Sequence, residues 1–469
     1  RNKMMHDTLI LCCHEGVKNT KQAFGNLFAQ VDYLCKVHGI KIADKIAIQT
    51  MRRHSNKQEP LSEEDLKYDA RALAIFISAV FQTDIPHELT VLIPHTNRPY
   101  QKGLDISNRC IRCIVKNWDS DFIHVDIDHD TDEEEHLVCL KDEANGIDHT
   151  YLCEILEEGM QLNLLDCQIR QPVITPRLII VEPDYLIDIS SIAACFTEFG
   201  HHPLLYLLNL MKPRANTQAT LLGNFAGAAL DDIINSHGKY QVNETIKSNF
   251  REKALEFCTC PWFDAKKFYT DANLQAYNLQ QVVDILFPRT ASQAQMNAFR
   301  GEGIYDRKKA ILEPSFVCEA LGIQGRVDLM TTDCKLLVEQ KSGRNLNIES
   351  HQADPNYHSF QLVPHYVQLL LYYGVLQHNF KLGNNLVNIR LLYSKYQPQN
   401  GLMVVAYYQK LFREAIEYRN QLVAASFEIA KKGFELALNE FTPDVLNVAG
   451  TQDFFYNKYL KPQLADITD

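Results

Sequence analysis

Asp328, Glu339 and Lys341 have side chains that could do chemistry together, and they fall in the segment 325–343, which reads GRVDLMTTDCKLLVEQKSG. Side chains alternate between the two faces of a strand, so a strand over 335–341 places Glu339 and Lys341 on the same face. A second strand over 324–330 and a tight turn at 331–334 bring Asp328 beside them. The sequence therefore predicts two acids and one base at the mouth of an otherwise apolar sheet.

Such a cluster is suited to holding a divalent cation. Burying these charges without partners costs several kcal/mol, and a cation offsets that cost. Asp328 and Glu339 offer the hard oxygen ligands that Mg²⁺ or Mn²⁺ prefers, and the backbone carbonyl of Gln340 can complete the protein's share. A bound cation would activate water and neutralise charge developing on phosphorus. Lys341 would then orient the attacking water or stabilise the transition state.

The order of these residues resembles the signature of the PD-(D/E)XK nuclease superfamily. Asp328, ten intervening residues and then Glu339-Gln340-Lys341 match the pattern D…(D/E)xK, and the preceding GRV at 325–327 resembles the GRID motif of the RecB-like branch. This resemblance covers roughly 221–377. It implies a restriction-endonuclease-like α/β core, with a short mixed sheet flanked by helices, and the hydrolysis of DNA.

Two more features agree with that family. Gln368 and Tyr372 lie four residues apart on a predicted helix and are similar to the QxxxY motif of RecB-like nucleases. The resemblance implies that this helix lies beside the catalytic pair and helps to hold both DNA and the lysine. Arg326 is a further DNA-binding candidate. Glu313 resembles the acid that commonly precedes the GRID strand, which makes it a candidate metal ligand.

One position departs from the family pattern. The segment 221–234 (LLGNFAGAALDDII) resembles the family's first helix, which usually supplies a metal-binding histidine in the pattern G-x-x-x-H. Gly227 occupies the histidine position here, which puts metal affinity in question. Asp231, one turn further on, and Glu313 are candidates to compensate. Three histidines are alternatives by residue type, although lone histidines are mostly structural: His201, His202 and His237.

The thirteen cysteines are scattered without regular spacing, which indicates reduced residues rather than a secreted disulfide framework. Several members of the family hold an iron–sulfur cluster through one cysteine before the nuclease core and three after it. No cysteine follows Cys334, so Cys258 and Cys260 lack distal partners, and we expect no such cluster. Cys110 and Cys113 form a CxxC without a second pair, which favours two core cysteines over a zinc site.

Composition sets the broad class. The 469 residues suggest about three domains, and 46% hydrophobic with 22% charged residues is typical of a globular protein. A net charge of −11 argues against coating DNA by bulk electrostatics. Much of that charge lies in the acidic run at 126–135, which we interpret as a solvated loop. No apolar run is long enough to span a bilayer and no signal peptide is evident, so we expect a cytoplasmic protein without membrane contact.

Patterning divides the chain into three regions. Residues 1–105 are predicted to be mainly helical, with helices over 20–38 and 60–82 and a short strand over 89–93. Residues 106–182 are predicted to form a β-rich unit, compatible with an oligonucleotide-binding (OB) type barrel and with other small β folds. Residues 183–469 are predicted to hold the nuclease core and helical additions. In the middle region we predict strands over 110–118, 121–127, 136–140, 161–168 and 177–181 and a helix over 151–158; the longest helix is predicted over 409–440.

Two functions from different classes follow. The first is a metal-dependent DNA nuclease acting on single-stranded or end-containing DNA, with the β-rich unit as a strand-binding accessory. No G-x-x-x-x-G-K-[ST] loop occurs, so the chain has no evident ATPase, and the resemblance implies a helicase, as a domain beyond Asp469 or as a separate subunit. The alternative is a non-catalytic nucleic-acid-binding or scaffold module that retains the nuclease fold. A third reading, an accidental motif in an unrelated α/β protein, would be revealed by Asp328 and Glu339 lying far apart.

Overall fold

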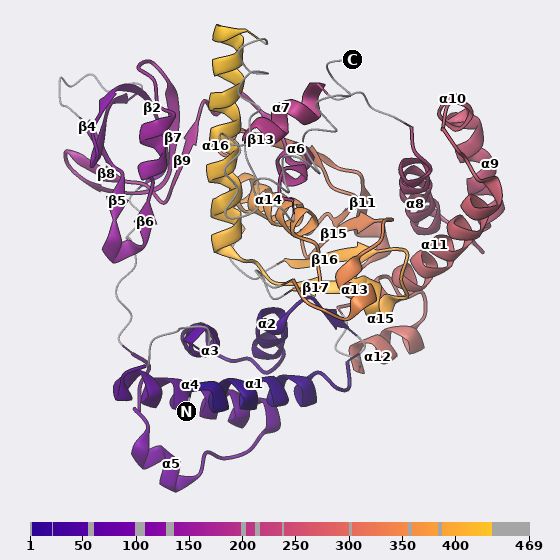
Figure 1. Ribbon diagram of the computed structural model, residues 1–469. Helices are drawn as coiled ribbons and strands as arrows, with labels where there is room; N and C mark the ends of the chain where they lie inside the picture. Colours follow the sequence, from indigo (N-terminus) through magenta and orange to yellow (C-terminus); the bar gives the residue numbers. More distant parts are fainter. Residues whose placement is uncertain are drawn as a thin grey trace.

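The computed structural model is a mixed α/β protein (Figure 1). It describes residues 2–20, 22–54, 61–98, 108–127, 136–197, 203–211, 216–236, 239–299, 303–354, 359–382 and 387–433. The histidines at 201, 202 and 237 and most of the acidic run lie outside these ranges. Within them, no helix is long and apolar enough to cross a membrane.

The N-terminal region is helical, and its first four helices share one apolar core. The predicted helix over 60–82 is α4, which begins after Ser62 because the Ser62 hydroxyl accepts a hydrogen bond from Asp65 N–H. The segment 20–38 contains the two-residue strand β1 before its helix. The five helices are α1 (Asn2–Gly16), α2 (Leu27–Val37), α3 (Ile42–His54), α4 (Glu63–Phe81) and α5 (His87–Leu92), and β1 spans Ala23–Phe24.

The strand predicted over 89–93 is wrong, because this segment belongs to α5. Pro86 precedes the first turn, and its carbonyl accepts hydrogen bonds from the Leu89 and Thr90 N–H groups. Val91 and Leu92 are 71% and 66% exposed, so no sheet covers the β-branched and aliphatic side chains that suggested a strand.

Five strands of the middle region close into a barrel. Around the ring the order is β2, β3, β4, β8, β7 and back to β2, and only the β4–β8 pair is parallel. A sixth strand, β9, extends the sheet beyond β7. The strands are β2 (Asn108–Trp118), β3 (Phe122–Ile127), β4 (His136–Cys139), β7 (Gln161–Arg170), β8 (Val173–Thr175) and β9 (Leu178–Val181).

Two details of the barrel differ from the expectations. The helix predicted over 151–158 is only the 3₁₀ turn η2 (Thr150–Glu154), which follows the small hairpin of β5 (Lys141–Asp142) and β6 (Ile147–Asp148). Cys113 is buried in the barrel core, but Cys110 is exposed, because residues three apart on a strand point to opposite faces. The prediction of two core cysteines therefore holds for Cys113 alone.

The large sheet has the order β1-β17-β16-β15-β14-β11, and a second sheet has the order β10-β13-β12. In the large sheet, β15 is parallel to β16 and antiparallel to β14. The strands are β10 (Ile187–Asp188), β11 (Ala310–Leu312), β12 (Ser315–Cys318), β13 (Ile323–Arg326), β14 (Leu329–Thr331), β15 (Leu336–Lys341), β16 (Asn388–Tyr393) and β17 (Leu402–Val405).

The single strand predicted over 324–330 is wrong, because β13 and β14 belong to different sheets. The interruption falls at Val327 and Asp328, whose backbone pairs with the β11–β12 connection instead. Val327 N–H donates to the Pro314 carbonyl at 3.2 Å, and the Asp328 carbonyl accepts from Glu313 N–H at 3.0 Å.

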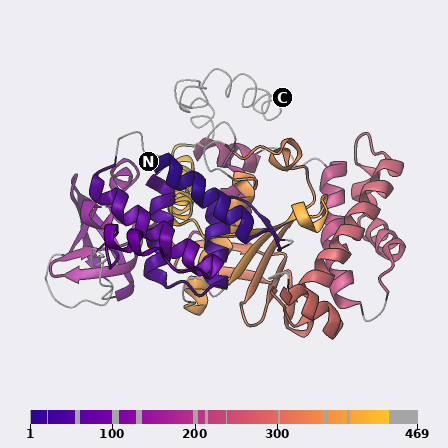
Figure 2. The ribbon, with the colours of Figure 1, turned by 90° about the horizontal axis from the view of Figure 1, so that it is seen from below.

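Helices cover both faces of the large sheet. Leu337 and Met330 pack in one apolar cluster with α14 and α16, whereas Leu336 and Val338 pack in another with α8 and α11. Figures 1 and 2 both place α8 to α11 at the end of the molecule opposite the barrel.

The helices of this region are α6 (Ile189–Ala194), α7 (Pro203–Met211), α8 (Gln218–Asn235), α9 (Val242–Glu252), α10 (Ala254–Cys258), α11 (Ala265–Leu286), α12 (Ala291–Phe299), α13 (Leu346–Ser350), α14 (Val363–Phe380), α15 (Pro398–Gly401) and α16 (Gln409–Lys432), with a 3₁₀ turn η3 (Arg307–Lys309). Residues 434–440 of the helix predicted over 409–440 lie outside the described ranges.

Helix α16 joins the barrel to the sheets (Figure 1). The fully buried Arg419 donates to the carbonyls of Val181, Glu182, Tyr185 and Gly322, which come from both sides of the junction. The neighbouring Asn420 accepts from Val181 N–H at 3.0 Å and donates to the Ile179 carbonyl at 2.7 Å. We call Arg419, Asn420 and these carbonyls the α16 junction.

Candidate active site

Glu339, Lys341 and Gln368 form a closed ring of hydrogen bonds between β15 and α14. Lys341 Nζ donates to Glu339 Oε1 at 2.8 Å and to Gln368 Oε1 at 2.9 Å. Gln368 Nε2 donates back to the same Glu339 oxygen at 2.7 Å. Glu339 and Lys341 therefore share one face of β15, as the alternation of the strand predicts, and α14 holds the lysine.

Asp328 lies beside this ring. The β14–β15 hairpin pairs Leu329 with Val338, so the antiparallel register continues to Asp328 opposite Glu339, and Asp328 Oδ2 accepts from the N–H of the next residue, Gln340, at 2.6 Å. Burial, and next the negative charge of Asp328, raise the pKa of Glu339 to about 8. Burial also raises the pKa of Asp328. The two carboxylates lie together, so the separation that would reveal an accidental motif is not found.

The backbone of Gln340 faces the carboxylates. The Lys341 carbonyl accepts from Ser394 N–H at 2.9 Å, on the β16 side of the strand. Because backbone groups of successive strand residues point to opposite sides, the Gln340 carbonyl points to the other side, where its N–H binds Asp328. This is the carbonyl that the sequence predicts as a metal ligand.

One oxygen of Glu339 has no partner within the described residues. Glu339 is 2% exposed, and its Oε2 makes no hydrogen bond in that part of the chain. A buried carboxylate oxygen without a donor is costly, and a cation is the partner that suits it. In the described ranges, no three His, Cys, Asp or Glu side chains converge as a ready-made metal site. The donor set still fits Mg²⁺ or Mn²⁺, which commonly takes one or two carboxylates and fills its other positions with water and substrate phosphate.

Helix α8 presents Gly223, Gly227 and Asp231 to this site, at the spacing of four that keeps residues on one face. A Cβ at Gly223 would lie 3.3 Å from Ser342 Oγ, directly after β15. A Cβ at Gly227 would meet nothing within 4 Å. Burial first, and then the charges of Glu313 and other acids, raise the pKa of Asp231 to about 7. Open space thus lies around position 227, where the sequence comparison with the PD-(D/E)XK pattern placed the missing histidine, with Asp231 one turn further on.

Glu313 lies at the β11–β12 connection with its backbone in the left-handed region, at φ 49°. A residue other than glycine is strained there, and such strain concentrates at functional sites. Its carboxylate pairs with Arg326 at 2.9 Å, and its N–H donates to the Asp328 carbonyl. Glu313 and Arg326 therefore adjoin Asp328 and are exposed.

Tyr372 supports the strand that precedes Asp328. Its hydroxyl donates to the Arg326 carbonyl at 2.6 Å. A Cβ added at Gly325 would lie only 3.0 Å from the Tyr372 ring. Because Gly325 has no side chain, the Tyr372 ring has room to pack against this strand. Tyr372 and Gln368 are 3% and 8% exposed, so both contact the strands of the site, and their contact with DNA stays a prediction.

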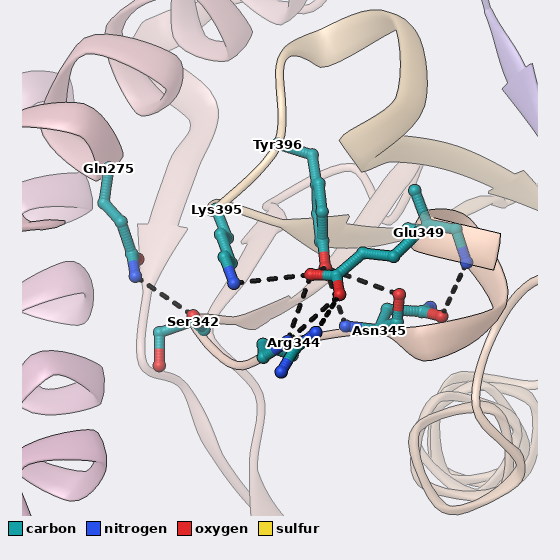
Figure 3. A network of polar contacts seen from close by, with 8 residues as sticks. Gln275, Ser342, Arg344, Asn345, Glu349, Lys395 and Tyr396 are labelled. Carbon is teal, nitrogen blue, oxygen red and sulfur yellow. Dashed lines mark hydrogen bonds and ion pairs between the residues drawn. The ribbon is translucent and has the colours of Figure 1, made fainter.

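Sequence reasoning missed a buried polar chain that fixes the end of β15. Gln340 Nε2 donates to Ser394 Oγ at 2.8 Å, and Ser394 Oγ donates to Gln275 Oε1 at 2.6 Å. Gln275 Nε2 in turn donates to the Ser342 carbonyl at 3.0 Å (Figure 3). A signal existed, because Gln275 falls on the apolar face of α11, where a glutamine needs a partner.

Neither a protein-family model nor a curated protein matches the chain.

Proposed function

We propose that this chain is a metal-dependent deoxyribonuclease with a PD-(D/E)XK core. One observation carries the proposal: Glu339 is buried beside Asp328 with one oxygen bound to Lys341 and Gln368, and its other oxygen has no partner among the described residues. The order of elements from α8 through β14, β15 and α14 to β16 also supports this core. An ordinary buried ion pair would have donors on both carboxylate oxygens, so the vacant oxygen favours a ligand site.

Asp328, Glu339 and the Gln340 carbonyl would hold Mg²⁺ or Mn²⁺, with Asp231 or Glu313 as further carboxylates. The cation would supply Lewis acidity, which lowers the pKa of bound water and stabilises charge on phosphorus. Gln368 fixes the Lys341 ammonium, so this group needs no reorganisation to meet a developing negative charge. The α14 helix thereby acts as a positioning element.

DNA is the proposed substrate, in single-stranded or end-containing form. The barrel supports this choice, since a closed five-stranded barrel with a helical turn between its third and fourth strands resembles the OB fold, which binds single strands. A helicase domain or subunit as partner is part of the same proposal and rests on the family resemblance alone. We propose no iron–sulfur cluster.

The alternative is a nucleic-acid-binding or scaffold module without activity. Retention of Asp328, Glu339 and Lys341 in hydrogen-bonded geometry favours the enzyme. Binding of Mn²⁺ separates the two, because a scaffold needs no cation at Glu339. Loss of Mn²⁺ binding on Glu339→Gln is therefore expected only for the enzyme.

Cleavage of end-labelled DNA in Mg²⁺ or Mn²⁺ tests the proposal, with single strands, duplexes and an RNA strand as substrates. Lys341→Ala is expected to lose about 10²-fold or more in rate, as does loss of one preorganised transition-state donor. Lys309→Ala is the matched control, because Lys309 forms an ion pair with Asp333 at the far end of the β14–β15 hairpin. A folded wild-type protein that cuts none of these substrates would contradict the nuclease and favour the scaffold.

A further inference from the structure

A second polar cluster lies beyond the carboxylate site, where β15 and β16 end (Figure 3). The Glu349 carboxylate accepts from Arg344 Nε at 3.0 Å, from Tyr396 Oη at 2.8 Å and from Lys395 Nζ at 3.4 Å. Arg344 Nη2 donates to it as well. Two cations are thus held on one anion, which leaves the cluster with a net positive charge.

The backbone around this cluster is fixed. The buried Asn345 caps α13, because its side chain accepts from Ile348 N–H at 3.1 Å, and Asn345 N–H donates to Tyr396 Oη at 2.8 Å. Gln275 holds the Ser342 carbonyl on the other side of Arg344 (Figure 3). Arg344 therefore projects from a loop that is tied down at both ends.

The two cations point outward, and the anion lies beneath them. The side chains of Arg344 and Lys395 are 66% and 36% exposed, against 27% for Glu349. Arg344 binds Glu349 through Nε and Nη2, and its Nη1 has no partner among the described residues. Exposed ion pairs contribute little to stability, so folding alone gives no reason to gather four donors on one carboxylate.

The position of the cluster links it to the proposed catalytic strand. Lys341 and Tyr393 are register partners in the parallel β15–β16 pair, so both strands end at the same edge of the sheet. Arg344 and Lys395 follow these partners by three and two residues. Three extended residues span at most roughly 10 Å, so the Arg344 backbone lies within about that distance of the Lys341 backbone.

We propose that Arg344 and Lys395 bind a backbone phosphate of the nucleic-acid strand, next to the phosphate that is cleaved. This inference rests on the proposed function, whose site it extends. A planar guanidinium held on its carboxylate can still present donors to a phosphate, and Lys395 adds a point charge. A protein of net charge −11 needs such local cations to hold a polyanion.

Binding of fluorescein-labelled oligothymidine, measured by anisotropy with Ca²⁺ in place of Mg²⁺, tests this site in the full chain. Arg344→Ala/Lys395→Ala is expected to bind about tenfold more weakly at low salt. The slope of log K against log salt should fall by roughly 1, as expected for a lost phosphate contact. The affinity and the salt slope are the readouts, because Arg344 and Lys395 are proposed to contact a bound phosphate.

Lys247→Ala/Arg251→Ala on α9 removes the same charge from another exposed surface and is expected to leave the salt slope unchanged. The charge-conserving variant Arg344→Lys/Lys395→Arg should keep most of the wild-type affinity. If the double alanine variant unfolds, the single variants Arg344→Gln and Lys395→Gln replace it in the binding measurement. Unchanged affinity and slope would overturn the phosphate site, and so would a loss confined to the cleavage rate. A wild type that binds but does not cut would overturn the nuclease while the binding comparison still decides this inference.

Discussion

Glu339 in the candidate active site and Arg419 in the α16 junction are both buried charges, 2% and 0% exposed. Their surroundings differ. Each nitrogen of the Arg419 guanidinium donates to at least one acceptor. The acceptors are four backbone carbonyls and Asn420 Oδ1. Within the described part of the chain, Glu339 has donors on one oxygen and none on the other. The junction is a closed network, and the site is an open one.

The difference separates stability from function. A closed buried network stabilises the fold, because every desolvated group recovers its hydrogen bonds. An open network costs free energy in the isolated protein and keeps a position available for a ligand. Substitutions at the two places should therefore have opposite signatures.

The largest expected effect is on activity at the open network. Asp328→Asn should lower single-turnover cleavage by about 10³-fold, because a metal ligand becomes a neutral amide. The free energy of unfolding in metal-free buffer should stay within about 1 kcal/mol or increase, since the like charge beside Glu339 is removed. Urea unfolding with and without Mg²⁺ checks the stability, and quenched single-turnover assays check the rate. A large loss of stability without metal would mean that the site is a structural network.

The next effect is on stability at the closed network. Arg419→Met should lower the free energy of unfolding by about 3–5 kcal/mol, since it leaves several buried carbonyls without donors. The cleavage rate per folded molecule should change little. Arg413→Ala on the same helix is the control, because the hydrogen bond from Arg413 to the Gly146 carbonyl is exposed. Equal losses in the free energy of unfolding for the two variants would show that the α16 junction stabilises the fold no more than the exposed Arg413 contact does.

A third prediction adds a ligand to the open network. Gly227→His should raise Mn²⁺ affinity about tenfold, because the position has room for a side chain beside Asp231 and the added imidazole is a metal ligand. Gly227→Ala is the matched control, since it shares the gain in helix propensity without a ligand. Titration followed by electron paramagnetic resonance measures the free Mn²⁺. Equal affinity in the two variants would place Gly227 outside the metal's reach.

The smallest effect concerns the cavity between α16 and the barrel, which Glu417 lines. Burial first and then Glu414 raise the pKa of Glu417 to about 7, while Arg413 opposes the shift and Asp148 adds to it. The stability linked to the raised pKa is complete below pH of about 4.3 and is lost as pH rises to 7. Glu417→Gln should flatten this decline by on the order of 1 kcal/mol, after allowance for its partial exposure. Urea midpoints at pH 5 and pH 7.5 test it; parallel curves for both proteins would exclude Glu417 as the cause.

Local rules predicted the heart of the site. Strand alternation placed Glu339 and Lys341 on one face, and the spacing of four placed Gln368 and Tyr372 on one face of α14. That this face lies beside the strands was implied by the family resemblance. The hairpin that positions Asp328 follows from the short turn at 331–334. These features depend on residues that are close in sequence, which is why a single chain was enough.

The other features of the fold and the site could not be predicted, because they depend on contacts between residues far apart in the sequence. The break between β13 and β14 depends on backbone bonds from Val327 and Asp328 to the β11–β12 connection. Ser394 and Gln275 are 119 residues apart, and Arg419 reaches Val181 across 238 residues. The propensities of neighbouring residues carry no information about such distant partners. The α5 helix shows the converse, because β-forming residues without a neighbouring strand remained helical.

The pairing of β1 with β17 has a consequence for how the chain is made. Ala23 and Phe24 lie parallel to Met403 and Val404, and Phe360 N–H donates to the Gly25 carbonyl at 2.7 Å. The outermost strand of the large sheet is thus supplied by a segment that is synthesised 380 residues before its partner Met403 and must wait for it. A fragment that begins after the N-terminal helices would expose the unpaired edge of β17, and such edges promote association between chains. Expression of the later region by itself is therefore expected to give aggregates that a supplied N-terminal region prevents.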